Sequence, residues 1–497
     1  MSDLVNAING YIWSLPLIYL CLGVGLYFSL RTRFLQIRHV KEMVRLMFKG
    51  ESSPAGISSF QALALSLSGR VGTGNIAGVA TAITFGGPGA VFWMWVVAFL
   101  GAGTAFVEST LAQIYKEKDD NGLYRGGPAY YIEKGLGMKW YAWIFAFATI
   151  IGCGLLLPGV QANSIASGIE NAFGIPTSVS AAAVVVLLGL IIFGGVKRIA
   201  HFTQIVVPFM ALGYILVAFV IIIMNIGMLP DVISLIVGSA FGLKAGFGAI
   251  LGLAIEWGVK RGIYSNEAGQ GTGPHAAAAA EVSHPAKQGL VQGFSVYIDT
   301  LFVCTATAFM VIITGAYNVM GKAGETLVEQ LPGVSAGPGY TQAAVESVMP
   351  GFGSIFVAVA LFFFAFTTIL AYYYIAETNV AYINRKVHRP WLTFVLKVAL
   401  MASVVYGSVK TAELAWGLGD IGVGLMAWLN IVAILLLQKP ALVALKDYEA
   451  QKAQGLDPTF DPTRLGIKNA DHWVKDKKAK SGLVGDEVVA DVQVERS

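Results

Sequence analysis

The sequence GRVGTGNIAG, residues Gly69–Gly78, has four glycines, an arginine and an asparagine in ten positions between two apolar segments. Glycine weakens a helix and adopts backbone angles that other residues avoid. The N–H and C=O groups freed by such a break cannot stay unsatisfied in hydrocarbon. We therefore expect a helix interrupted at this stretch, with its free backbone groups facing protein, water or a ligand.

The composition is typical of an integral membrane protein. Of the 497 residues, 56% are hydrophobic and 13% are charged, whereas soluble domains carry about 25% charged residues. A crossing needs about 20 apolar helical residues, and the apolar segments predict an all-α integral membrane protein with eleven transmembrane helices. These are Tyr11–Leu30, Ile57–Phe85, Gly89–Tyr115, Trp140–Ile165, Ser178–Val196, Thr203–Ile226, Gly246–Glu281, Gln288–Ala316, Gly351–Asn384, Trp391–Val409 and Leu414–Gln438.

The distribution of Lys and Arg predicts the orientation. Most of the 34 Lys and Arg residues fall in the predicted loops on one side, while the opposite loops hold Lys244, Lys322 and Lys410. Loops rich in Lys and Arg stay in the cytoplasm. We therefore expect the N-terminus outside and the C-terminus inside.

A second copy of the opening pattern occurs in KRGIYSNEAGQGTG, residues Lys260–Gly273. Arg70 and Asn75 of the first copy correspond to Arg261 and Asn266 of the second, at the same spacing. In the predicted topology the first copy crosses outward and the second inward. The two copies therefore predict a 5+5 inverted repeat with two broken helices, which is a pointer to a transporter binding site at the midplane.

This repeat divides the chain into four parts. Residues 1–56 hold one extra N-terminal transmembrane helix and a cytoplasmic amphipathic helix, residues 57–226 and 227–438 are the two repeats, and residues 439–497 form a cytoplasmic polar tail. The tail past Leu445 is expected to be solvated or disordered. The outer segment Tyr317–Pro350 is expected to form short helices from TLVEQL and YTQAAVESV, as a lid or a passive loop.

A broken membrane helix suits the binding of an amino acid with a cation. The N-terminus of a half-helix offers N–H groups to a carboxylate, and free carbonyls coordinate a cation. Two alternatives are close helix packing by glycine and a dinucleotide loop, since Gly72, Gly74 and Gly78 nearly form GxGxxG. A dinucleotide loop requires a βαβ unit, and the antiparallel repetition favours the broken helix over packing alone.

Other functional classes find little support in the sequence. Cys21, Cys153 and Cys304 lie in apolar segments, and the six histidines show no metal-binding pattern. The small net charge of +4 and the basic loops fit membrane topology better than nucleic-acid binding. We therefore expect no enzyme activity, no cofactor and no nucleic-acid partner.

Three separated motifs resemble the alanine or glycine:cation symporter family of bacteria and archaea. They are VGTGNIAG at Val71–Gly78, RGGPAYYIEKGLG at Arg125–Gly137 and RGIYSNEAGQGTGP at Arg261–Pro274, and the likeness extends nearly to Gln438. The resemblance implies the fold of the bacterial leucine transporter (LeuT) and alternating access. It also implies sodium-coupled symport of a small neutral amino acid, alanine or glycine, across the cytoplasmic (inner) membrane.

The resemblance further implies the substrate site. The amides of Thr73 and Gly74 would hold the substrate carboxylate, and Gln161 would hydrogen-bond the amino group. Tyr264 would limit side-chain size, at a position where the family frequently has Phe. The same second break contributes Ser265 and Asn266.

Sodium would be held at two places by this resemblance. Asn75 would coordinate one ion near the carboxylate. The carbonyls of Ser68 and Val71 would join the adjacent hydroxyls of Thr367 and Thr368 at a second ion. Oxygen ligands suit a hard cation, although a membrane Thr also commonly bonds its own preceding carbonyl.

Two questions remain open at this point. Proton coupling through Glu267 or Asp299 is the alternative to sodium, and an ion channel is a more distant one. Arg70 and Arg261 would brace the breaks through buried acids. Candidate partners are Glu108, Glu256, Glu267 and Asp299.

Overall fold

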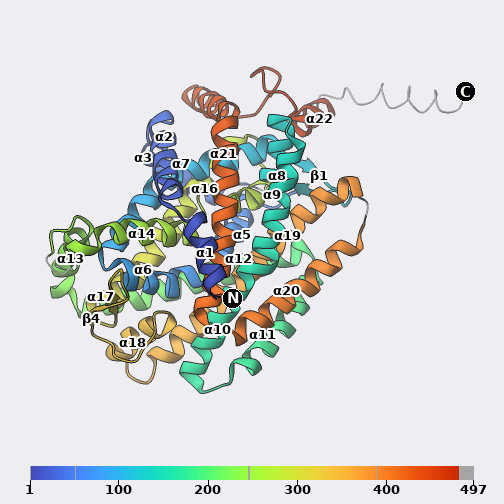
Figure 1. Ribbon diagram of the computed structural model, residues 1–497. Coiled ribbons are helices and arrows are strands. Elements are labelled where there is room, and N and C mark those ends of the chain that lie inside the picture. The colour runs from blue at the N-terminus through green and yellow to red at the C-terminus, as the bar shows by residue number, and fades with distance from the viewer. Residues whose placement is uncertain (1, 51, 245–246, 388, 481–497) are drawn as a thin grey trace, which may run out of the picture.

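The computed structural model describes residues 2–50, 52–244, 247–387 and 389–480, and they form a bundle of helices (Figure 1). The strands in this part of the chain make two short antiparallel pairs, β1 (Glu117–Lys118) with β2 (Tyr124–Arg125) and β3 (Asn318–Met320) with β4 (Thr326–Glu329). The protein is therefore mainly helical, as predicted.

Seven helical stretches in the described residues are long and apolar enough to cross a membrane, or eight with the bent pair α1 (Ser2–Ile12) and α2 (Leu15–Arg31). The other three predicted crossings correspond to the shorter α11 (Thr177–Ile192) and to two interrupted helices. The seven stretches are α7 (Gly89–Ile114), α9 (Lys139–Ile151) with η3 (Gly152–Leu156) and α10 (Leu157–Phe173), α12 (Val196–Met224), α16 (Pro285–Val296) with η6 (Tyr297–Cys304) and α17 (Thr305–Ile313), α19 (Gly353–Val387), α20 (Trp391–Val409) and α21 (Ala412–Ala453).

The first interrupted helix consists of α5 (Ser59–Arg70), the π-helical turn η1 (Gly74–Gly78) and α6 (Val79–Gly86). It begins at Ser58 because the Ser58 hydroxyl accepts from the Gln61 amide and the Gln61 side chain accepts from the Ser58 amide. Such a capping box satisfies two free donors at a helix start. The interruption falls at residues 71–73, within the predicted stretch.

The second interrupted helix consists of α14 (Leu251–Asn266), preceded by η5 (Gly248–Ile250), and α15 (Gly273–Ala279). Glu267, Gly269 and Gly271 between the two parts have φ of 57°, 82° and 85°. These left-handed angles favour glycine, which explains Gly269 and Gly271, whereas Glu267 adopts such an angle as the residue that ends α14.

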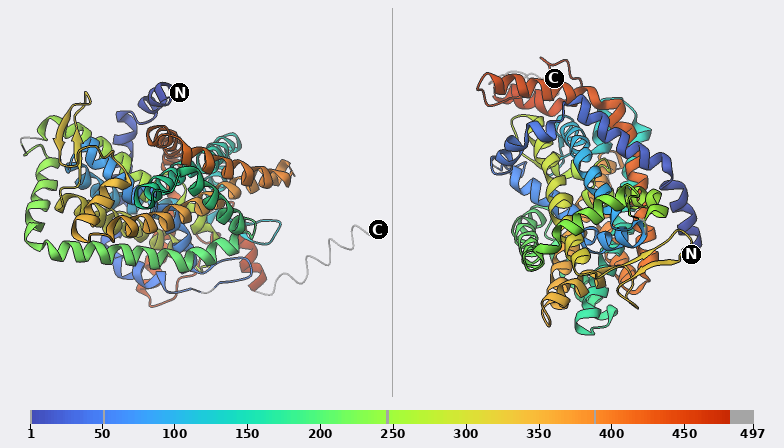
Figure 2. Two further views of the ribbon diagram at one scale, coloured as in Figure 1. Left: turned by 90° about the horizontal axis from the view of Figure 1, so that it is seen from below. Right: turned by 90° about the vertical axis from the view of Figure 1, so that its left-hand side faces the viewer.

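The N-terminal helices lie on the outside of the bundle along α21 (Figure 2, right). The Asn9 amide donates to the Gly417 carbonyl at 2.8 Å, and the Trp13 indole donates to the Asp420 carbonyl at 2.9 Å. The predicted amphipathic segment forms α3 (Leu35–Arg38) and α4 (Val40–Met47). Helix α12 packs on α5 and α19, runs along one edge of the bundle (Figure 2, left) and exposes apolar side chains such as Phe209.

The outer segment after α17 differs in part from the prediction. The sequence YTQAAVESV lies in α18 (Pro338–Val348) as expected, but TLVEQL contributes β4 instead of a helix. Its Thr326 and Val328 are β-branched and suit a strand, and this strand pairs with β3. The remaining connecting elements are α8 (Pro128–Tyr131), η2 (Ile132–Leu136), η4 (Ile226–Met228) and α13 (Leu229–Ala240).

The tail past Leu445 was expected to be solvated or disordered, and the disordered alternative is wrong for the described residues. Helix α21 continues to Ala453, and α22 (Asp471–Lys480) follows near the chain's end. The reason is that the charged tail carries apolar anchors, since Tyr448, Phe460 and Trp473 are buried. The indole of Trp473 donates to the Gln113 carbonyl at 2.9 Å, which attaches the tail to the C-terminal end of α7. Residues 481–497 lie outside the described residues.

Candidate functional site

The first break brings free backbone amides next to side chains from other helices. The Thr73 amide donates to Oε1 of Gln161 on α10 at 3.0 Å, and the Gly72 amide donates to Oδ1 of Asn75 at 2.8 Å. All four residues are buried. Thr73, Asn75 and Gln161 are thus brought together, with Gln161 acting as an acceptor toward the break.

Gly72 lies where no side chain fits. A Cβ built on it would lie 2.4 Å from Oγ1 of Thr368 and 3.0 Å from Oε1 of Gln161. The neighbouring Gly74 is also closely packed, since its Cβ would lie 3.2 Å from the Tyr264 ring and 3.3 Å from Cα of Ser265. The glycines therefore allow three helices to approach the break.

Backbone carbonyls at the first break lie close to Thr368, one of the two threonines whose hydroxyls were predicted to bind sodium. Oγ1 of Thr368 lies 2.8 Å from the Ser68 carbonyl and 3.5 Å from the Val71 carbonyl, and it also lies 2.9 Å from the Phe364 carbonyl. Oγ1 of Thr367 instead lies 2.9 Å from the Phe363 carbonyl on its own helix. The structure therefore brings Ser68, Val71 and Thr368 together and turns the Thr367 hydroxyl toward α19 itself.

Asn75 also contacts a second polar cluster, which is centred on the Asp299 carboxylate. Its Nδ2 donates to Oδ1 of Asp299 at 2.6 Å, and the Ser265 hydroxyl donates to the same oxygen at 3.1 Å. Oδ2 of Asp299 accepts from the Thr300 hydroxyl at 2.6 Å. Sequence reasoning named Asp299 only as a proton carrier or a partner of an arginine, whereas here it joins Asn75 and Ser265.

Aromatic side chains close the site on the side of α21. The Tyr264 ring packs against the Trp416 ring at 4.9 Å between centroids, and both residues are buried. Trp416 also lines an outer cavity of about 520 Å³ between α10 and α18. Tyr264 and Trp416 thus separate this cavity from Gly74. Trp416 was missed because a tryptophan in an apolar helix has no sequence feature that distinguishes it from core packing.

Asn266 is the last residue of α14, and its side-chain oxygen does not contact the polar cluster around Asp299. Its Oδ1 accepts from the Ala268 amide at 3.0 Å, which is a local turn interaction. The second break is held further by Glu108, whose carboxylate accepts from the Gly269 amide at 3.2 Å and from Asn430 at 2.7 Å.

In the described residues, neither arginine forms an ion pair with the acids that were predicted as its partners. The Arg261 guanidinium pairs with both oxygens of Asp420 on α21, at 2.8 and 3.1 Å, and Lys260 joins at 2.8 Å. Asp420 was not among the proposed acids, because 159 residues separate it from Arg261. Arg70 donates instead to the Gln292 carbonyl at 3.2 Å and to the Ser295 hydroxyl.

Two broken helices with buried polar groups between them, in a multi-pass apolar bundle, define a membrane transport protein. A solved transporter shares the fold, since a mutant form of the Eremococcus coleocola manganese transporter aligns with a TM-score of 0.51 at 14% identity. That alignment covers 86% of this chain and 87% of the other. The chain belongs to the sodium:alanine symporter family, which it matches over residues 1–462.

Relatives agree with this membership. YrbD of Bacillus subtilis (strain 168) is 67% identical over 97% of this chain and 100% of its own length. The sodium/proton-dependent alanine carrier protein of Bacillus sp. (strain PS3) is 58% identical over 87% of this chain and 97% of its own length. The chain is therefore a carrier and not an enzyme.

Proposed function

We propose that this protein imports a small neutral amino acid, alanine or glycine, together with sodium by alternating access. The proposal rests mainly on the first break. There the Thr73 amide donates to Gln161, and the Ser68 carbonyl accepts from the Thr368 hydroxyl. One interrupted helix thus offers donors for an anion and acceptors for a cation.

The geometry suggests how the carboxylate and amino group are held. The Thr73 amide, now bonded to Oε1 of Gln161, is the donor proposed for the substrate carboxylate, together with the Gly74 amide. A carboxylate there would displace the Gln161 oxygen, which is then able to accept from the substrate ammonium. One side chain thereby exchanges an internal hydrogen bond for one to the substrate.

Two sodium positions follow from the oxygen atoms around the break. Asn75 is proposed for the first, with the Asp299 carboxylate beside it. The carbonyls of Ser68 and Val71 and the Thr368 hydroxyl are proposed for the second. Carboxylate, carbonyl and hydroxyl oxygens are the ligands that hard cations prefer.

The size of the substrate is limited by the packing around Gly74. Tyr264 and Ser265 lie within van der Waals distance of a Cβ at this position, and Trp416 supports Tyr264 from behind. A methyl side chain fits such a site better than a branched one, which supports alanine and glycine.

The topology proposed for this function has eleven crossings, with the 5+5 inverted repeat of the leucine transporter after one extra helix. It is supported by the two interrupted helices and the additional pair α1–α2. The Lys and Arg distribution supports an outside N-terminus and an inside C-terminus in the cytoplasmic membrane of a bacterium or archaeon.

Uptake by purified protein in proteoliposomes tests this function. Radiolabelled alanine uptake is expected to follow an imposed sodium gradient and to be inhibited by glycine far more than by leucine. Uptake without sodium would refute the coupling, and strong inhibition by leucine would refute the size limit.

Proton coupling is the second candidate, and Glu267 favours it. The Glu267 side chain is buried, and its backbone is in the left-handed conformation. Its Oε1 has no hydrogen-bond partner in the described part of the chain. Its other carboxylate oxygen reaches across to α5, 3.2 Å from a Cβ built on Gly69. The Bacillus PS3 relative is named a sodium/proton-dependent carrier. Under this candidate, uptake by the wild type would follow pH and would not depend on sodium, and Glu267→Gln would abolish the pH dependence.

A further inference from the structure

A cavity of about 710 Å³ lies between the end of α2 and the end of α21, at the end of the bundle where the basic loops gather. We call it the α2–α21 pocket. Its charged lining is unbalanced, with five cations and one carboxylate. These are Arg31, Arg33, Arg38, Lys439, Lys446 and Glu449.

The single carboxylate is already engaged. Glu449 pairs with Arg33 at 3.1 Å, with Arg38 at 2.8 Å and with His39 at 2.9 Å. Arg31, Lys439 and Lys446 have no ion pair with any residue that the structure describes. The α2–α21 pocket therefore keeps an excess of positive charge that its own residues do not neutralise.

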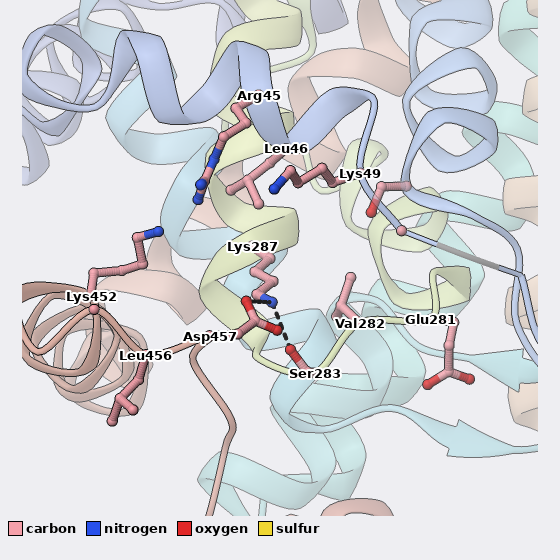
Figure 3. A pocket seen from close by; sticks show the side chains of 13 residues that line it. Arg45, Leu46, Lys49, Glu281, Val282, Ser283, Lys287, Lys452, Leu456 and Asp457 are labelled. Carbon is pink, nitrogen blue, oxygen red and sulfur yellow. Dashed lines mark hydrogen bonds and ion pairs between the residues drawn. The ribbon is translucent and has the colours of Figure 1, made fainter.

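A neighbouring basic pocket of about 610 Å³ provides a contrast (Figure 3). There Lys287 points toward Asp457 and Ser283, with both distances 2.7 Å. Arg45 and Lys452 both lie near the Glu42 carboxylate, at 2.5 and 3.6 Å. Most of the cations in this second pocket are thus neutralised within the protein, so positive charge on this face does not by itself indicate a ligand.

The α2–α21 pocket also has apolar walls that lead toward the lipid-facing surface. Tyr27, Leu442 and Val443 line it. Leu30 on α2 is 57% exposed, and Leu436 on α21 is 60% exposed, each within one helical turn of a lining cation. A soluble anion would use only the cations, whereas a phospholipid would use the cations and this apolar surface together.

We propose that the α2–α21 pocket binds an anionic phospholipid, with the phosphate at Arg31, Lys439 and Lys446 and the acyl chains along Leu30 and Leu436. Lys439 and Lys446 are separated by seven residues and therefore lie on one face of α21. Clusters of Lys and Arg at the end of a membrane helix attract anionic lipids. The bound lipid would join α2 to the end of α21.

Photo-crosslinking tests this site without relying on transport. Full-length protein in phosphatidylcholine vesicles that contain a small fraction of photoreactive phosphatidylglycerol is expected to be labelled at residues 27–38 and 436–446. Lys439→Gln with Lys446→Gln should weaken labelling roughly 30-fold, from the contribution of two surface cations. The control Lys49→Gln with Lys452→Gln removes two positive charges from the second pocket and should leave labelling unchanged.

Inorganic phosphate distinguishes a lipid from a soluble anion. Millimolar phosphate is expected to leave the labelling unchanged, because it lacks the acyl chains. Loss of labelling in phosphate would assign the pocket to a soluble anion and overturn the lipid proposal. Equal loss in both double variants would show general surface attraction, which would overturn it as well.

Discussion

Gly72 and Gly78 belong to the same sequence motif, but their surroundings differ. A Cβ on Gly72 would lie 2.4 Å from Oγ1 of Thr368, whereas the nearest atom to a Cβ on Gly78 is 3.5 Å away, in the Trp416 ring. The first distance requires a shift of the neighbouring side chain, and the second is an ordinary contact. At the scale of single residues, only one of these glycines is required by the site.

This difference makes a direct prediction. Gly72→Ala should reduce alanine uptake by roughly tenfold or more, because the new methyl group displaces Thr368 and Gln161, and overpacking of this kind costs about 1–3 kcal/mol. Gly78→Ala is the matched control and should keep most of its uptake. Equal uptake in the two variants, measured in proteoliposomes at the same protein content, would contradict the geometry.

Asn75 makes a second prediction at this scale. Asn75→Ala removes the acceptor of the Gly72 amide and a donor to Asp299, and unsatisfied buried groups cost about 1–3 kcal/mol each. Sodium affinity and alanine affinity, measured by calorimetry, should fall together. Asn163→Ala, which removes a buried amide bonded to the Gly407 carbonyl, should affect stability but not sodium affinity. Unchanged sodium affinity in a folded Asn75→Ala protein would exclude Asn75 as a ligand.

At the scale of elements, the sequence was sufficient to predict both interruptions, because glycine-rich stretches with matched Arg and Asn stand out from apolar helices. The π-helical turns η1, η2, η3 and η6 were not predictable, since their widening depends on packing against other helices rather than on composition. The same limit applies to Thr367 and Thr368, because adjacent helical residues point in directions about 100° apart and the sequence does not say which one faces α5.

The different positions of the two hydroxyls give a separate prediction for each threonine. Thr368→Val should raise the sodium concentration for half-maximal uptake by about tenfold, since it removes one of the few oxygen ligands that a hard cation requires. Thr367→Val has the same change in shape and should leave this concentration nearly unchanged, because its hydroxyl bonds its own helix. Similar shifts in both variants would show that the hydroxyls act through helix stability and not through sodium.

At the scale of the whole molecule, the tail connects parts that the sequence alone could not place together. The Phe460 amide donates to the Ser283 carbonyl at 3.0 Å, and the Phe460 ring packs against the His284 ring at 5.4 Å between centroids. The centroid of the Tyr448 ring also lies 5.4 Å from that of the His284 ring. The tail is thus attached around one buried histidine just before α16, through contacts across more than 160 residues.

His284 should make this attachment sensitive to pH. Burial lowers the pKa of His284 to about 4, although Asp447 at 3.4 Å opposes the shift and the nearby Lys287 and Arg464 add to it. Nδ1 accepts from the Ala286 amide at 3.1 Å, which requires the unprotonated nitrogen. The unfolded histidine has a pKa near 6.5, so the unfolded chain binds more protons between these two values. The contribution of His284 to the free energy of unfolding is therefore fully present above pH 6.5 and decreases as the pH falls toward 4.

Thermal unfolding at two pH values tests this expectation. Between pH 7 and pH 5 the wild type should lose about 2 kcal/mol through His284, which is seen as a lower melting temperature and faster proteolysis of residues 454–470. His284→Gln should lose less over the same interval, because its amide does not titrate. His201→Gln, at an exposed histidine on α12, should behave like the wild type. If His284→Gln showed the full loss, other groups would control the tail, and the burial of His284 would not make its attachment depend on pH.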